Sequence, residues 1–102
     1  MEWENKKKMV QLGNQRDNSD DAKNEFQKFV LENLDSFDLQ AWNMFCNLVD
    51  LIVTEMKKDL EFWKQVYSRM KNIDCTNKEL GLRSGMRIAI IQTICEDELL
   101  LS

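Results

Sequence analysis

The most regular hydrophobic pattern in the chain lies between residues 37 and 73. Apolar side chains recur there at alternating steps of four and three positions, a seven-residue period held for about four heptads. The residues on this seam are Trp42, Cys46, Val49, Val53, Met56, Leu60, Trp63, Tyr67 and Met70. The seam predicts a long central helix, and two helices broken near Lys57–Lys58–Asp59 are the alternative.

Further apolar residues widen this seam on both sides. They are Ala41, Phe45, Leu48, Ile52, Phe62, Val66 and Ile73. A two-stranded coiled coil buries only a narrow stripe, so a helix with this wide apolar face must be covered from more than one direction. The sequence therefore predicts an all-α fold, a small helical bundle of three to four main helices, and the absence of proline agrees with this. A coiled-coil homo-oligomer built on the same seam is the alternative.

The N-terminal third of the chain contains one well-marked amphipathic helix. Ser19 can cap its free backbone amides, and apolar side chains then recur at helical spacing over residues 22–34. The preceding residues suit a short helix that stops at Gly13 and is followed by a polar linker. We therefore predict a flexible N-terminal arm over residues 1–19 and a single helical domain over residues 20–102.

The last third of the chain carries its own helix signals. Thr76 and Glu79 have the spacing of a capping box, which predicts a short helical turn. Ser84 can cap a final helix that runs from Gly85 to about Leu100. The residues expected to face inward on this helix are Met86, Ile90, Ile91, Ile94 and Cys95.

Part of this segment resembles a known family. The order Leu80-Gly81-Leu82, then Gly85-Met86-Arg87, then Ile90-Ile91 resembles the end of a sterile alpha motif domain, a helical module for protein association or RNA binding. The resemblance covers about twenty of the 102 residues and implies a short helix closed by the first glycine. The long apolar seam upstream departs from the pattern of that family, which has several short helices there.

The same residues are loosely similar to the turn of a helix-turn-helix. In that comparison Arg83 and Arg87 lie near the recognition helix. The segment from Gly85 to Ile94, however, is apolar almost all round, whereas a recognition helix exposes polar side chains to base edges.

Charge is unevenly distributed along a chain whose net charge is −4. Residues 17–55 contain nine acids and two bases, whereas residues 57–87 contain eight bases and four acids. The basic stretch suits an acidic partner, and its use in nucleic-acid binding is the runner-up function. The residues expected on this basic face are Lys57, Lys58, Lys64, Arg69, Lys71, Arg83 and Arg87.

Few residues in the chain suit catalysis or metal binding. Histidine is absent, so the commonest general base and metal ligand is missing. The three cysteines are widely spaced and form no Cys-x-x-Cys motif, and no glycine-rich loop has phosphate-binding spacing. We therefore expect neither enzymatic activity nor a metal or cofactor. Free cysteines and the absence of a signal segment or a long apolar run favour the cytoplasm or nucleus, with no membrane partner.

The function that these patterns favour is protein–protein interaction by helix packing, as in an adaptor, an assembly subunit or a small inhibitor. The expected partner is another protein or a second copy of the chain, and nucleic acid is the less favoured alternative. Aromatic and large apolar side chains dominate such interfaces. The candidate interface residues are Trp3, Trp42, Val49, Val53, Met56, Leu60, Trp63, Tyr67 and Met70.

Overall fold

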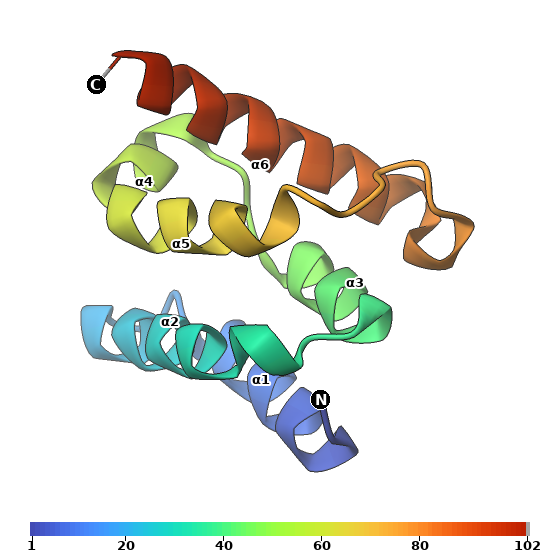
Figure 1. Cartoon of the computed structure of the whole chain (residues 1–102). Coiled ribbons are helices and arrows are strands. Elements are labelled where there is room, and N and C mark those ends of the chain that lie inside the picture. The colour runs from blue at the N-terminus through green and yellow to red at the C-terminus, as the bar shows by residue number, and fades with distance from the viewer. Residues whose placement is uncertain (102) are drawn as a thin grey trace. The chain divides into compact units, whose positions relative to one another are not determined.

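The computed structural model describes the backbone of residues 1–101 and the side chains of residues 1–97. Over this part of the chain the fold is all-helical, as the sequence predicts, with six α-helices and no strand (Figure 1). The helices are α1 Trp3–Gln15, α2 Asp20–Asn33, α3 Leu39–Leu48, α4 Val53–Lys58, α5 Leu60–Met70 and α6 Gly81–Leu101, with 3-10 turns η1 Leu34–Ser36 and η2 Lys78–Leu80. Contacts group the chain into an N-terminal unit, Met1–Val49, and a C-terminal unit that begins at Asp50.

The expectation of three to four main helices with a long central one is wrong. The seam is divided among α3, α4 and α5, because residues 49–52 leave the helical conformation and the chain breaks again at Asp59. Val49 and Ile52 are extended, with ψ values of 142° and 114°. These β-branched residues have low helix propensity, and an extended segment still buries Val49. The alternative prediction, two helices broken near Asp59, places one break correctly, but the chain also leaves the helical conformation earlier, at residues 49–52.

The expectation of a flexible N-terminal arm is also wrong. The first helix, α1, spans 13 residues and packs against α2 and α3. Its Met9 is fully buried and Leu12 is nearly so. Gly13 does not stop the helix. A Cβ atom at this position would lie 3.0 Å from a methyl group of Leu48 and 3.3 Å from the ring of Phe26, so there is little room for a side chain. The glycine therefore serves close helix packing, and α1 continues to Gln15.

A buried lysine fixes α1 to the start of α3. The side chain of Lys6 is only 7% exposed, and its Nζ donates to Asp38 Oδ2 at 3.0 Å and to Gln40 Oε1 at 2.7 Å. Asp38 also caps α3 by accepting a hydrogen bond from the Ala41 amide at 2.8 Å. Desolvation works against the ionised form of Asp38, but the hydrogen bonds from Ala41 and Lys6 outweigh it, so the pKa of this carboxyl is lowered.

Replacing Asp38 with alanine is expected to cost roughly 1–3 kcal/mol of stability at neutral pH, through loss of the helix cap and of the partner of a buried lysine. Because the pKa of Asp38 is lowered on folding, its contribution is present above the unfolded pKa of about 3.9 and is lost as the pH falls through the folded value. Chemical denaturation at pH 7 and pH 2.5 measures both effects. Asp17→Ala, at an exposed position in the turn after α1, is the control. If Asp38→Ala lowered the free energy of unfolding equally at the two pH values, the ionised Asp38 carboxylate would not stabilise the fold.

An aromatic cluster forms the core of the N-terminal unit. Phe45 is fully buried, and its ring centroid lies 6.2 Å from Phe26, 6.3 Å from Phe37 and 6.2 Å from Trp42. Phe37 and Trp42 are closer still, at 4.8 Å in an edge-to-face arrangement. These residues come from α2, α3 and the loop before α3, so the cluster joins segments that are separate in the sequence.

The C-terminal unit is built on the pairing of α5 with α6 (Figure 1). Apolar side chains from both helices are buried: Phe62, Trp63, Val66, Met70, Ile88, Ile91 and Cys95. Hydrogen bonds between described residues of the two helices also cross the pair. Cys95 Sγ donates to the Trp63 carbonyl at 3.6 Å, Gln92 Nε2 to the Met70 carbonyl at 2.9 Å, and Tyr67 Oη to Glu96 Oε1 at 3.1 Å. The pairing thereby fixes which face of α6 is buried.

Two glycines determine how the chain enters α6. Gly81 has a φ of +75° and a ψ of 161°, a conformation that only glycine adopts easily, and α6 begins here rather than at Gly85. Gly85 lies inside the helix, where the Cys75 carbonyl oxygen occupies the place of a side chain. The predicted capping box does not form. Asn77 caps η2 by accepting from the Glu79 amide, whereas Thr76 donates to Asp74.

Candidate interaction groove

The first half of α6 leaves an apolar row exposed. Ser84, Ile88, Ile91 and Cys95 form the buried stripe of the helix. Leu82, Met86 and Ile90, at four-residue spacing, are 84%, 59% and 43% exposed. The expectation that Met86 and Ile90 face inward is therefore wrong. The helix is apolar on most sides, so its pattern alone does not identify the face that α5 covers.

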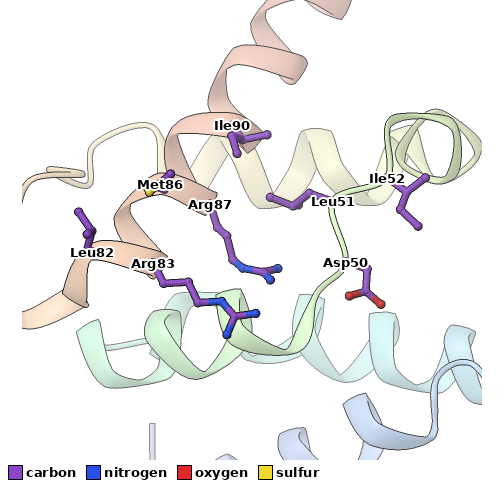
Figure 2. A pocket seen from close by; sticks show the side chains of 8 residues that line it. All are labelled: Asp50, Leu51, Ile52, Leu82, Arg83, Met86, Arg87 and Ile90. Atoms are coloured by element: carbon purple, nitrogen blue, oxygen red, sulfur yellow. The ribbon is translucent and has the colours of Figure 1, made fainter.

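This exposed row forms one side of a groove in the C-terminal unit. Asp50, Leu51 and Ile52, in the extended segment before α4, form the other side, and the volume enclosed is about 620 Å³ (Figure 2). Ile52 is more than half exposed, as is Met86 on the α6 side. The break in the predicted long helix thus has a structural consequence, because the extended segment supplies one wall of the groove.

Two arginines give the groove its charge. Arg83 and Arg87 lie on α6 one residue after Leu82 and Met86, and in Figure 2 both guanidinium groups point toward the segment that carries Asp50. No other charged residue occurs between Leu80 and Cys95. The α6 side of the groove is therefore apolar and positively charged, and the opposite side carries a carboxylate.

A second hollow of about 600 Å³ lies beside the first. It is formed by Leu82, Met86, Gly81, Gly85, Ala89 and the loop from Cys75 to Lys78. Leu82 and Met86 line both hollows, so they form a ridge between them. The thiol of Cys75 is half-buried and donates to Gln92 Oε1 at 3.6 Å. A partner that covers the ridge would contact both hollows.

The interface residues predicted from the sequence are mostly inside the fold. Trp42, Val49, Met56, Trp63 and Met70 are buried, and Leu60 and Tyr67 are half-buried. Trp3 and Val53 are exposed, but Trp3 belongs to α1 in the N-terminal unit, where Lys7 lies 5.8 Å from its ring. The structure therefore does not bring these nine residues to one surface patch, because the seam serves mainly as core.

The predicted basic residues lie on several elements. Lys57 and Lys58 end α4, Lys64 and Arg69 belong to α5, Lys71 follows α5, and Arg83 and Arg87 belong to α6. Lys58 is paired with Glu55 at 3.3 Å. Arg83 and Arg87 are the two that line the groove.

Two further titratable groups have shifted pKa values. Partial desolvation and the hydrogen bond to Glu96 raise the pKa of Tyr67, and two hydrogen bonds from Thr76 lower the pKa of Asp74. Among the residues that the structure describes, no group of histidine, cysteine and acidic side chains could hold a metal ion. Within the same residues, no helix has the length and apolar character needed to span a membrane.

Comparison with known proteins gives no family or fold relative. No protein-family model, no curated protein and no solved structure matches the chain.

Proposed function

We propose that the chain is a protein–protein interaction module whose binding surface is the groove between α6 and residues 50–52. The observation that carries this proposal is the exposed row Leu82, Met86 and Ile90, which lines the groove together with Leu51 and Ile52. Contiguous exposed apolar surface on a small protein marks interaction sites far more often than isolated exposed residues do.

The shape of the surface suits a helix as ligand. An amphipathic helix binds a protein groove by placing apolar side chains from successive turns between the two walls. The groove here has one helical wall and one extended wall, and its ridge presents the exposed side chains of Leu82 and Met86 to a ligand. Methionine adapts its shape to different partners, which suits a recognition surface.

Selection from a phage-displayed library of helical peptides tests this function. We expect peptides enriched on the wild-type protein to lose at least about 100-fold in affinity for Leu82→Glu, because the substitution places a charge at the centre of the apolar row. Fluorescence anisotropy with labelled copies of the enriched peptides measures the loss. Leu82 is 84% exposed, so the variant keeps its fold, which circular dichroism verifies.

Trp3→Glu is the matched control for this experiment. It places the same charge at an exposed apolar residue, but in the N-terminal unit. Enriched peptides should bind Trp3→Glu with wild-type affinity. Failure to enrich any peptide, or enrichment of peptides that bind Leu82→Glu as well as wild type, would reject the groove as the binding surface.

A further inference from the structure

We infer that the helix bound by this surface is α6 of a second copy of the chain, paired antiparallel with α6 of the first. The inference rests on the proposed function and names the partner. It starts from five exposed residues of α6 that recur at spacings of three, four, three and four: Arg83, Met86, Ile90, Thr93 and Asp97. These residues form the outer face of α6. Side chains at this spacing follow one side of a helix, the arrangement by which two helices pack together in a coiled coil.

The outer face lies on the opposite side of α6 from its packing on α5. The buried residues of the helix alternate with those of the outer face along the chain, and they are Ser84, Ile88, Ile91 and Cys95. With 3.6 residues per turn, the two sets lie on opposite sides of the helix. A second helix can therefore pack on the outer face while α6 keeps its contacts with α5.

Opposite charges at the two ends of the outer face determine the direction of pairing. Arg83 and Asp97 are both exposed and lie 14 residues apart, about 21 Å along the helix. Parallel pairing would bring like charges level with each other at both ends, whereas antiparallel pairing brings Arg83 of each copy level with Asp97 of the other. Arg87 and Asp50 already have interactions within the chain, and the pairing does not depend on them.

Apolar side chains then occupy the middle of the pair. When Arg83 is level with Asp97 of the second copy, the two-fold axis passes close to Ile90, the residue midway between them. Ile90 then meets the same residue of the second copy, and Met86 packs near Thr93 of the second copy. Both apolar side chains are exposed in the single chain. The outer face is thus complementary to itself, which a two-fold interface requires.

The short length of the outer face limits the strength of pairing. It spans two heptads, and each copy contributes few large apolar side chains. Interfaces below about 1,200 Å² are typical of transient complexes. We therefore expect a reversible monomer–dimer equilibrium with a dissociation constant on the order of 10–100 µM.

Analytical ultracentrifugation of the full chain, at concentrations below and above this dissociation constant, tests the inference. Ile90→Glu places two carboxylates beside the two-fold axis and should weaken dimerisation at least about 10-fold. Val53→Glu is the matched control, because Val53 is an exposed apolar residue of the same unit that does not belong to the outer face. It should change the dissociation constant by less than about 2-fold. Circular dichroism verifies that both variants are folded.

Exchange of the two end charges tests the direction of pairing without touching an apolar residue. Arg83→Asp alone and Asp97→Arg alone each create two like-charge contacts in an antiparallel dimer and should weaken it roughly 3- to 10-fold. The double variant Arg83→Asp/Asp97→Arg restores opposite charges and should dimerise within about 2-fold of wild type. In a parallel dimer each single variant would only exchange one like-charge pair for another, so neither would weaken it.

The outcomes separate the inference from the proposed function. Enriched peptides that bind the groove of a chain that stays monomeric at every concentration would overturn the second copy and leave the groove function standing. A dimer that Ile90→Glu leaves intact, or single charge variants that the double variant does not rescue, would also overturn the inferred pairing. Absence of both peptide binding and dimerisation would overturn the inference and the proposed function together.

Discussion

Replacing Phe45 with alanine is expected to lower the free energy of unfolding of the N-terminal unit by roughly 3–5 kcal/mol. The ring is fully buried and lies within 6.3 Å, between ring centroids, of three other aromatic rings. Its loss leaves a cavity that α2 and α3 cannot fill without separating from their other contacts. Native-state hydrogen exchange read by mass spectrometry measures the loss separately in each unit.

The control for this substitution is Asn47→Ala on the same helix. Asn47 is exposed, and its side-chain amide donates to Asn43 Oδ1 one turn away, so its replacement should change stability by no more than about 0.5 kcal/mol. A loss below about 1 kcal/mol for Phe45→Ala would show that the aromatic cluster is not the core of this unit.

The second large effect is expected at Gly85. A methyl group added there would collide with the Cys75 carbonyl oxygen, which belongs to the backbone and cannot rotate away. Gly85→Ala should therefore destabilise the C-terminal unit by at least about 3 kcal/mol, despite the gain of about 1 kcal/mol in helix propensity. Hydrogen exchange in α6 and the Cys75 loop measures this loss.

Leu82→Ala is the control for Gly85→Ala. It lies in the first turn of the same helix and is 84% exposed, so it should shift stability by less than about 0.5 kcal/mol. If Gly85→Ala were as stable as wild type, the loop from Cys75 would not be held against α6, and the second hollow beside the ridge would not exist in this form.

The all-helical class and several local features follow from the sequence for clear physical reasons. Ser19 caps α2 as expected, with its side chain accepting from the Ala22 amide at 3.1 Å. Most residues of the seam are buried, because heptad spacing correctly reports which side chains face a core. The same spacing continues through Val49 and Asp59, where the backbone is not helical, so periodicity does not reveal the breaks.

The ordered N-terminal helix depends on contacts that hydrophobic patterns do not record. Lys6 counts as a surface residue in any such pattern, yet it is buried because Asp38 and Gln40 supply oxygens from 32 and 34 positions away. Gly13 resembles a helix stop, but its small size instead permits contact with Leu48. The burial of Lys6 and the close packing at Gly13 both depend on residues far away in the sequence, so a local sequence pattern cannot predict them.

The sequence does not predict the groove, for a related reason. Its one indication is that residues 85–94 are apolar on nearly every side, which is more surface than one neighbouring helix can cover. Once α5 covers Ile88 and Ile91, the row of Leu82, Met86 and Ile90 is left at the surface. The sequence favours seam residues such as Trp63 as interface candidates because aromatic side chains serve both cores and interfaces.

The most direct test of the proposed function is titration of the ¹⁵N-labelled protein with an enriched peptide, followed by two-dimensional NMR. We expect the largest amide shift changes along Leu82–Ile90 and in residues 50–53, with saturation at one peptide per chain and no such changes in Leu82→Glu. Shift changes concentrated in α1 and α2, or an unchanged spectrum at saturating peptide, would contradict binding in the groove.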